Sequence, residues 1–366
     1  MVTFFFVIFA EIFIHQNKHS RNMKKSILFF VAFIAIATIA KAQGSVLATL
    51  NHNDTIQTFY GASAYQAALD AATHGDVITL SAGQFLAKNI EKAVSIHGAG
   101  MGVGENTDAA TVIVNDFSIN IPNEVTERLE MEGIYHNGNI EISSYKTLKN
   151  PTFMKCRFKN FYTCYEYSMV SDWYSRIVNG TFLHCYIKDL LRIARYSSVS
   201  LINCFVGKID DREYHDGMNS NFDFLNCVLW DMNGSRAQNS TFNNCIIYST
   251  RTDNALYSAN NTANNCVIVH DSINVFQNIA NTSNTLVNDV EEVFQNFKGT
   301  YADNVTYELT DAAKQKYKGT DGTEVGMYGG SFPFDPTTSN PRITRCVVAP
   351  KSTADGKLSI DIEVSN

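Results

Sequence analysis

The chain has 366 residues, of which 18% are charged and 12% aromatic, so it is long enough to bury a large apolar core and to cover its ends. Its net charge is −7, and the part beyond residue 42 carries −11, because five basic residues and only one acidic residue precede that point. This acidic balance argues against nucleic acid and anionic membranes as partners.

The first 42 residues predict an export signal that is not part of the fold. Met23-Lys24-Lys25 is basic, the stretch from Ile27 to Ala40 is apolar, and Ala40-Lys41-Ala42 suits cleavage after small residues. We expect Met23 as the true start, cleavage after Ala42, and a protein that is secreted or held on the outer cell surface. The alternative is a membrane anchor, but both apolar runs are shorter than the roughly 18 residues a span needs, so no span is expected in the mature chain.

The region after this signal predicts a strand and a helix. Residues 44–60 favour an extended strand at Ser45–Leu50 followed by a polar turn. Ala62–Ala72 is rich in alanine and predicts a short helix, with Ser63 as its N-cap and Gly75 beyond its end. We expect this helix to cover the end of an apolar core that would otherwise expose a strand edge.

One short phrase then recurs from Phe153 to Val287, with a cysteine between two apolar pieces. Successive cysteines of this phrase are 29, 19, 23, 18 and 21 residues apart, a spacing typical of a solenoid that adds one coil per repeat. The series consists of Cys156, Cys185, Cys204, Cys227, Cys245 and Cys266. Gly133 stands 23 residues before Cys156 and is expected in the same column. The whole run predicts roughly nine or ten coils.

The residues around each cysteine predict strands and turns. Apolar residues alternate over five or six positions, which is strand period and strand length, while Asn, Gly and Ser cluster between the phrases. Stacking such strands about 4.8 Å apart would place the cysteines in a buried column of free thiols. It would also allow a column of Asn residues to bond amide to amide.

These features together resemble a known family. The helix, the following segment Gly75–Phe85 and the stacked Asn and aliphatic positions resemble the right-handed parallel β-helix of the pectate-lyase-like superfamily. The resemblance implies an all-β, right-handed parallel β-helix with an N-terminal capping helix. Asp321–Gly330 resembles the closing turn of secreted bacterial β-helix proteins. Of the catalytic motifs of polygalacturonases and pectate lyases, the chain offers only Asp210-Asp211.

We expect four segments along the chain. Residues 1–42 are the N-terminal extension and signal peptide, and residues 43–290 hold the capping helix and the β-helix. Residues 291–335 close the helix, and residues 336–366 form a linker and a terminal strand pair.

Aromatic residues concentrate in the longest interval between two cysteines of the repeat, from Lys159 to Asn179. Tyr167, Trp173 and Tyr174 are the candidate ligand-binding rings, because flat rings on an exposed loop suit the C–H faces of sugars. The alternative is that these rings close a satellite core beneath the loop.

A second candidate site lies on the side of the solenoid that follows each cysteine phrase. Matching positions on neighbouring coils lie about 5 Å apart and on alternate coils about 10 Å apart, near the separations that glycosidases use. A row of carboxylates also suits Ca²⁺, although no metal-ligand spacing appears. The alternative is a solvated face whose charges pair across coils. The candidate catalytic residues are Asp189, Asp210, Asp211 and Asp231, and the candidate ligand-binding arginines are Arg192, Arg212 and Arg236.

Two hypotheses for function remain. The favoured one is an exported or surface-associated protein that binds a polysaccharide, a cell-surface glycan or another surface ligand without catalysis. The alternative is a polysaccharide lyase or glycoside hydrolase that uses the acidic side. The sequence leaves open whether the protein is an enzyme, since the fold alone hosts many functions.

Overall fold

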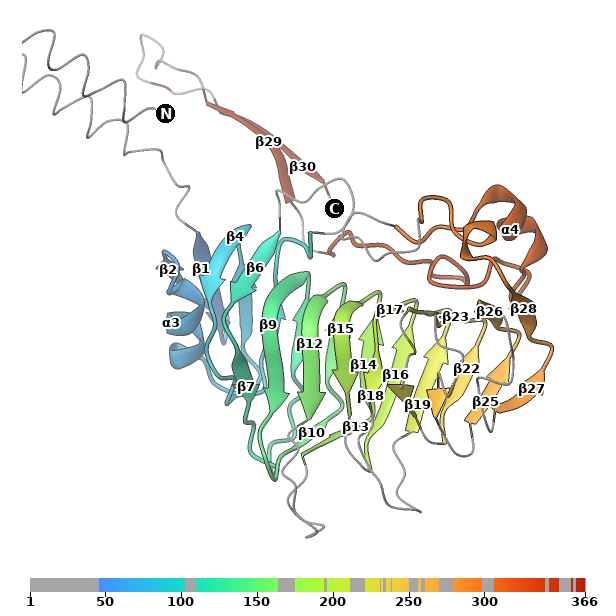
Figure 1. Ribbon diagram of the computed structural model, residues 1–366. Coiled ribbons are helices and arrows are strands. Elements are labelled where there is room, and N and C mark those ends of the chain that lie inside the picture. Colours follow the sequence, from blue (N-terminus) through green and yellow to red (C-terminus); the bar gives the residue numbers. More distant parts are fainter. Residues whose placement is uncertain are drawn as a thin grey trace, which may run out of the picture. The chain divides into compact units, whose positions relative to one another are not determined.

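The computed structural model describes residues 46–102, 110–163, 175–193, 196–210, 221–230, 232, 235–237, 239–249, 256–257, 261–269, 279–297, 306–339, 342–348, 357 and 360–365. From Val46 onward the chain is mostly β and forms a parallel β-solenoid, as the repeat predicted (Figure 1). Helices are few among the described residues.

The first sheet carries the strands that precede each cysteine. Its order is β2 (Thr55–Tyr60), β1 (Leu47–His52), β3 (Val77–Leu80), β5 (Ser95–His97), β8 (Glu130–Glu132), β11 (Thr152–Met154), β14 (Gly180–Leu183), β16 (Ser198–Ile202), β19 (Asn221–Leu225), β22 (Thr241–Asn243), β25 (Asn261–Asn264) and β27 (Ile279–Thr282). Only the pairs made by β1 are antiparallel in this described order.

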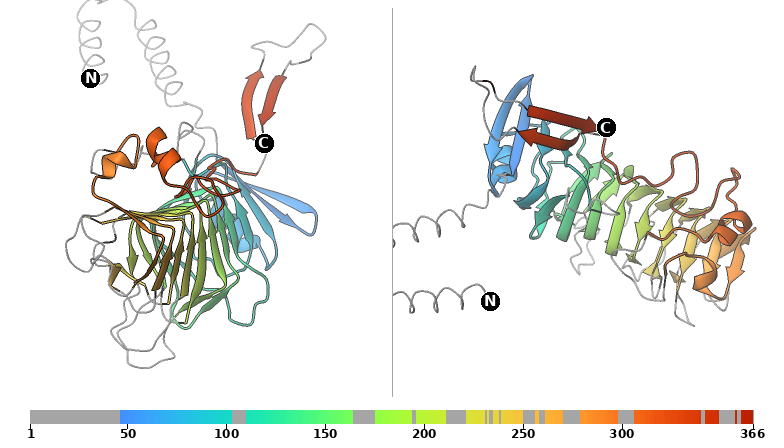
Figure 2. Two further views of the ribbon diagram at one scale, coloured as in Figure 1. Left: turned by 90° about the vertical axis from the view of Figure 1, so that its right-hand side faces the viewer. Right: turned by 90° about the horizontal axis from the view of Figure 1, so that it is seen from above.

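The second sheet carries the strands that follow each cysteine. Its order is β28 (Thr285–Val287), β26 (Val267–Val269), β23 (Ile246–Tyr248), β20 (Val228–Leu229), β17 (Phe205–Val206), β15 (Tyr186–Arg192), β12 (Arg157–Thr163), β9 (Ile134–Ile142), β6 (Thr111–Val114) and β4 (Gly83–Leu86). Beside this path, β18 (Ile209–Asp210) pairs with β15, and β7 (Phe117–Ile119) pairs with β9. Figure 2 shows the successive coils lying over one another when the stack is viewed along its length.

The remaining described elements are short. Two parallel pairs complete the coils, β10 (Thr147–Lys149) with β13 (Arg176–Val178) and β21 (Ser235–Arg236) with β24 (Leu256–Tyr257). The helices are α3 (Ala64–Ala71), η3 (Val290–Glu292) and α4 (Asp311–Lys316), and the last two strands, β29 (Arg342–Val348) and β30 (Ile360–Ser365), form an antiparallel hairpin.

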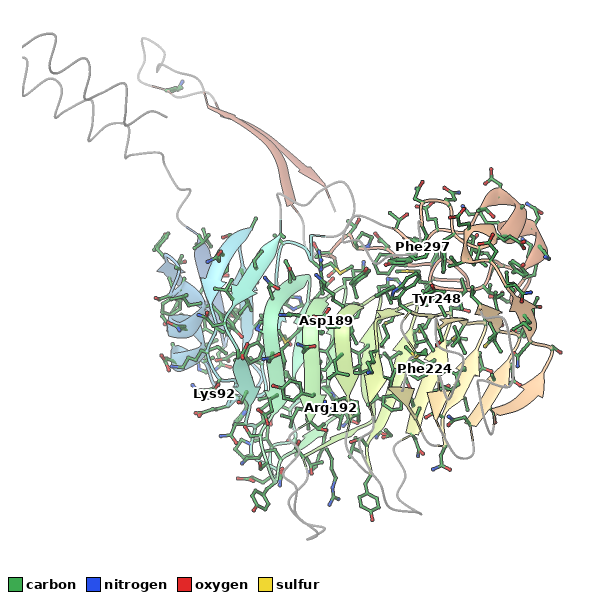
Figure 3. The ribbon with its side chains drawn as sticks, in the orientation of Figure 1. Lys92, Asp189, Arg192, Phe224, Tyr248 and Phe297 are labelled. Carbon is green, nitrogen blue, oxygen red and sulfur yellow. The ribbon has the colours of Figure 1, made fainter. Side chains whose placement is uncertain are left out.

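The region before α3 is a hairpin rather than one strand with a trailing turn. Asn53 and Asp54 both have positive φ, at 47° and 62°, which is the geometry of a tight two-residue hairpin turn. Ser63 is at the N-cap of α3, but its side chain makes no capping hydrogen bond. At the other end, Lys92 Nζ donates to two carbonyl oxygens of the last turn, at 2.9 Å each, which satisfies groups that a helix leaves unpaired (Figure 3).

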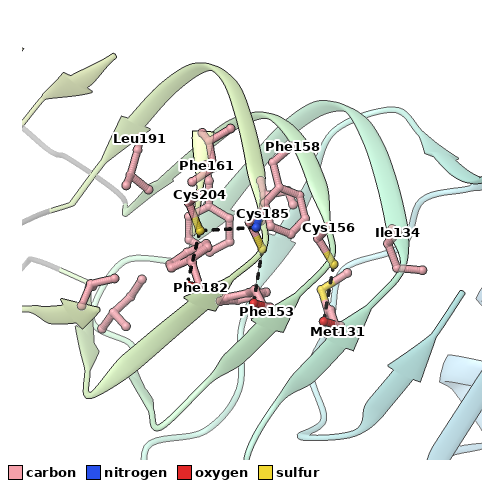
Figure 4. Packing of buried hydrophobic residues seen from close by; sticks show 14 of the residues in the cluster. Met131, Ile134, Phe153, Cys156, Phe158, Phe161, Phe182, Cys185, Leu191 and Cys204 are labelled. Carbon is pink, nitrogen blue, oxygen red and sulfur yellow. Dashed lines mark hydrogen bonds between the residues drawn. The ribbon is translucent and has the colours of Figure 1, made fainter. Parts of the chain in front are cut away.

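The six cysteines of the repeat form a buried column of free thiols, as the sequence predicted. Each thiol donates to a carbonyl oxygen of an earlier coil, for example Cys185 to Phe153 and Cys204 to Phe182, both at 3.3 Å (Figure 4). The rings of Phe153 and Phe182 stack beside the column with centroids 4.8 Å apart. Cys164 lies outside the described residues.

The residue before each cysteine turns the chain from the first sheet into the second. Every one of these residues has a positive φ near 50°, a conformation that Asn tolerates better than most residues. We call them the turn column: Lys155, His184, Asn203, Asn226, Asn244 and Asn265. The expected amide ladder is present in part, since Asn265 Nδ2 donates to Asn244 Oδ1 at 3.0 Å.

The position of Gly133 differs from the expected one by one residue. Tyr135 is in register with Arg157, so Ile134 is level with Cys156 and Gly133 is level with Lys155. Gly133 therefore belongs to the turn column, and its φ of 66° is the reason that glycine suits this position.

Residues 318–339, which we call the strap, run back along the turn column. Lys318 O accepts from Asn265 Nδ2 at 2.7 Å, and further along, Met327 O and Gly329 O accept from Asn203 Nδ2 at 2.8 and 2.7 Å. Later strap residues contact earlier coils: Phe332 O bonds to His184, Thr337 O to Lys155, and Ser339 to Glu132. The strap thus crosses the coils in the reverse of their chain order.

The chain around the strap also covers an outward-facing apolar column. The residue after each cysteine from Cys185 onward points away from the thiol core and is buried in a second apolar cluster with residues from Val293 to Phe334. This column consists of Tyr186, Phe205, Val228, Ile246 and Val267. The ring of Tyr307, for example, stacks on Phe205 with centroids 4.5 Å apart.

Candidate functional site

The structure describes the side chains of two of the ten predicted site residues, Asp189 and Arg192, both on β15. For Asp210 and Arg236 only the strand position is described. The remaining six residues lie outside the described part of the chain: Tyr167, Trp173, Tyr174, Asp211, Arg212 and Asp231.

A β-bulge separates Asp189 from the register of its neighbours. Between Phe158 and Asn160 the pairing of β12 with β15 shifts by one residue, so β15 carries an extra residue at Lys188–Asp189. As a result Asp210 pairs with Arg192, not with Asp189. Asp189 is exposed, and Figure 3 shows it separated from Arg192 along the strand.

Beyond the bulge, polar residues from five consecutive coils are in register along the second sheet. Ser118 pairs with Glu141, Glu141 with Tyr162, Tyr162 with Arg192, and Arg192 with Asp210. We call these five residues the polar column. The strands that carry it lie side by side in Figure 1. The first four side chains are half-buried, whereas their immediate neighbours, such as Ile140 and Phe161, are buried in the core, so strand alternation turns these four side chains outward.

A hydrogen-bonded row next to the polar column holds the first of these strands together. Asp116 accepts from both the backbone N–H and the side-chain amide of Asn139 at 2.8 Å, and Asn160 Nδ2 donates to Asn139 Oδ1 at 2.9 Å. The bond from the Asn139 backbone is the main reason that the pKa of Asp116 is lowered. The row therefore fixes the strands beside Glu141 and Tyr162.

The polar column lies at strand ends from which two predicted loops begin. β12 ends at Thr163, directly before the segment that carries Tyr167, Trp173 and Tyr174. β18 ends at Asp210, directly before Asp211 and Arg212. Chain connectivity therefore ties the two predicted groups to the ends of β12 and β18, which pair with β15 from opposite sides.

The acidic residues of the polar column stand on strands that are far apart. Along the register, the backbone positions of Glu141 and Asp210 are three strand steps apart, about 14 Å at the usual strand spacing, whereas paired glycosidase carboxylates are about 5 to 9.5 Å apart. In the described residues no cluster of three or more His, Cys, Asp or Glu residues is arranged to hold a metal ion. The helices in the same described ranges are all too short or too polar to cross a membrane.

Glu141 and Tyr162 are members of the polar column that the sequence did not single out. Glu141 stands seven residues after Ile134, and Tyr162 stands six residues after Cys156. In the next two coils, Arg192 stands seven residues after Cys185, and Asp210 stands six residues after Cys204. The alternating offset comes from the bulges beside β12, so a count that allowed one extra residue would have aligned them.

His97, His136 and His184 have structural partners. His136 is fully buried and bonds to Asn115 O at 2.8 Å, and His97 contacts Glu132 at 3.2 Å. His184 occupies the turn column and bonds to the strap.

No protein-family model, no curated protein and no solved structure matches the chain.

Proposed function

We propose that this protein is an exported β-solenoid that binds a polysaccharide or a cell-surface glycan along the polar column, without cleaving it. The observation that carries this proposal is the register that sets Tyr162 between Glu141 on one neighbouring coil and Arg192 on the other. Each of these three residues stands seven or eight positions after the turn-column residue of its own coil, so it is separated along the chain from the residues that contact the strap.

The chemistry of this arrangement suits a sugar polymer. An aromatic ring offers a flat apolar surface to sugar C–H groups, while a carboxylate accepts and a guanidinium donates hydrogen bonds to hydroxyl groups. Because matching positions recur about every 4.8 Å, the polar column offers contacts in a line to an extended ligand. The segments that follow Thr163 and Asp210 in the sequence carry Trp173, Tyr174 and Arg212, which we propose as further ligand contacts.

Binding without cleavage is supported by the backbone register. It sets the strand positions of Glu141 and Asp210 three strand steps apart, which is further than the spacing of a carboxylate pair that attacks one glycosidic bond. Asp189 stands in the bulge, outside the register of both.

The test is retention of the purified protein on a panel of acidic and neutral polysaccharides, with the dissociation constant measured for any that binds. Tyr162→Leu keeps apolar bulk and removes the ring, and Arg192→Gln removes the charge. Each should weaken binding about tenfold, the effect of losing roughly 1.4 kcal/mol. Tyr145→Leu is the matched control, because Tyr145 is 50% exposed and is not in the polar column.

A site at the polar column would be contradicted if all three variants weakened polysaccharide binding equally, or if no variant weakened it. The same incubations are assayed for new reducing ends and for unsaturated products. Their appearance would support the hydrolase or lyase alternative and would refute binding without cleavage.

A further inference from the structure

Strand β2 lies at the end of the first sheet and is exposed along its length. It pairs with β1 on one side and has no described neighbour on the other. Ile56 and Tyr60 are 68% and 69% exposed, the highest exposures of large apolar residues in the described part of the chain except Phe332. Such an edge is a template for another strand.

The hydrogen-bond pattern shows which backbone groups face the open side. Gly61 N donates to Val46 O at 2.8 Å, so this pair is one of the bonded pairs of the antiparallel ladder. Bonded and non-bonded pairs alternate, so Thr55, Gln57 and Phe59 also face β1. The N–H and C=O groups of Ile56, Thr58 and Tyr60 therefore point away from the sheet.

The neighbouring edge at this end of the solenoid is covered, whereas no described segment of the chain covers β2. At the edge of the second sheet, Leu86 N in β4 donates to Ala62 O at 3.0 Å, just before α3. The sequence of β2, Thr-Ile-Gln-Thr-Phe-Tyr, contains no charged residue, no proline and no glycine, the features that usually block edge pairing. An uncharged strand in a chain of net charge −7 also allows two like-charged copies to approach there.

We propose that β2 pairs with β2 of a second copy of this chain, antiparallel about a two-fold axis at Thr58. In this register Thr58 faces Thr58, and Ile56 faces Tyr60 of the second copy. Every outward backbone group of the three residues then has a partner. A shift of the axis to Gln57 would leave Tyr60 without a partner.

Side chains select the same register and favour a second copy over an unrelated strand. Ile56 and Tyr60 lie on the same face of β2, because they are four positions apart on a strand. The two-fold axis therefore places an aromatic ring opposite a β-branched side chain twice, a favourable cross-strand pair. The pattern is complementary to itself, as a two-fold interface requires.

The first test removes the central backbone donor and uses the purified full chain in sedimentation velocity over a range of concentrations. Thr58→Pro should raise the dissociation constant of the dimer at least about a hundredfold. Thr58→Val, which keeps the N–H, should remain dimeric. The Thr58 N–H does not bond to β1, so proline is tolerated within the monomer, and the melting temperature should match that of the wild type at protein concentrations low enough for the wild type to be monomeric. A wild-type chain that remains monomeric, or a Thr58→Pro variant that remains dimeric, overturns the proposal.

The second test reads the register. Ile56→Glu and Tyr60→Lys should each produce monomers, because each places charges opposite an apolar residue. The variant that combines both substitutions places a carboxylate opposite an ammonium group of the second copy at both pairs and should restore the dimer. Failure of this rescue, or open-ended oligomers in the wild type, refutes the two-fold register.

Discussion

The cysteine column shows how the coils pack free thiols in their core without disulfides. Cys156 donates to Met131 O at 3.4 Å, and burial raises the pKa of its thiol to about 12. Burial likewise raises the pKa of Cys185 well above its ordinary value. Since the thiolate is the reactive form, both side chains act as small core residues rather than as nucleophiles.

Glu132 is the charged residue that joins the strap to an early coil. Its residue surface is 2% exposed, and it accepts from Ser339 N at 2.8 Å, from Ser339 Oγ at 2.6 Å and from His97 at 3.2 Å. Burial tends to raise its pKa, but the hydrogen bonds from His97 and Ser339 outweigh burial and lower the pKa to about 2.

This lowered pKa predicts an acid-dependent loss of stability. Because the pKa of Glu132 is about 2 when folded and 4.5 as its ordinary value, its contribution is complete above pH 4.5 and disappears as the pH falls toward 2. The shift corresponds to about 3 kcal/mol in the free energy of unfolding. Urea unfolding of Glu132→Gln from pH 7 to pH 2 should show a smaller decrease with acid than the wild type.

The control for this titration is Glu124→Gln, an exposed carboxylate outside the strap contact. Glu124→Gln should follow the wild-type profile. Parallel profiles for wild type and Glu132→Gln would show that Glu132 does not contribute the acid dependence.

At the scale of elements, the strap forms hydrogen bonds with five of the six residues of the turn column in the described part of the chain, all but Asn226. The strap is held closely at its glycines: a Cβ at Gly326, where φ is 83°, would lie 2.7 Å from Ile246 Cδ1, and one at Gly330 would lie 2.3 Å from Asn226 Nδ2. Thr323 Oγ1 accepts from Gly330 N at 2.7 Å and donates to Asp321 at 2.7 Å, so the turn also binds itself. The glycines and these bonds hold Asp321–Gly330 in a compact turn against the coils, as the sequence of this segment suggested.

Asn203 provides the sharpest test of the strap. Its residue surface is 1% exposed and its amide donates to two strap carbonyls. Asn203→Ala should lower the free energy of unfolding by about 3 kcal/mol, about 1 for each lost hydrogen bond and about 1 for alanine at positive φ. Asn179→Ala, at an exposed position with a φ of 55° and no strap contact among the described residues, should lose only about 1 kcal/mol. Equal losses in urea unfolding would contradict the role given to the strap bonds.

The repeat predicted the coils well because its signal is local. A strand period of two and a cysteine at a fixed place in each phrase define which side chains enter the core. Gly133 was assigned one position too late in its coil, since glycine and Ile134 are adjacent and both fit a turn followed by a strand. The contacts of the strap with the turn column join residues as far apart as Asn203 and Gly329, and no local pattern encodes such pairs.

The candidate site was harder to predict than the fold. Arg192 and Asp210 were both selected, but their direct pairing depends on a bulge that adds one residue to β15. Glu141 and Tyr162 lie in the same column, on the paired strands β9 and β12. A single Glu and a single Tyr in strands with alternating apolar residues form no recognisable sequence motif. Alignment across coils, which the register supplies, is what distinguishes them.

For the whole molecule, the strap and its apolar cluster change how a solenoid unfolds. In a simple repeat array each coil contacts only its neighbours, so ends can unfold separately. Here the strap bonds to coils from Asn265 back to Glu132, and the second cluster covers the outer apolar column of the same coils. Loss of one coil would therefore disturb contacts along the stack, which favours cooperative unfolding.

Truncation tests this coupling. A chain that ends at residue 289 lacks the strap and exposes the outer apolar column, including Tyr186 and Phe205. It should bind more of a hydrophobic dye and unfold in urea over a broader range with a smaller m-value, because its coils unfold separately and less surface is exposed in each step. A chain that ends at residue 341 keeps the strap and should unfold like the full chain. If both truncated chains unfold as sharply as the full chain, cooperativity resides in the coils themselves and the strap only covers them.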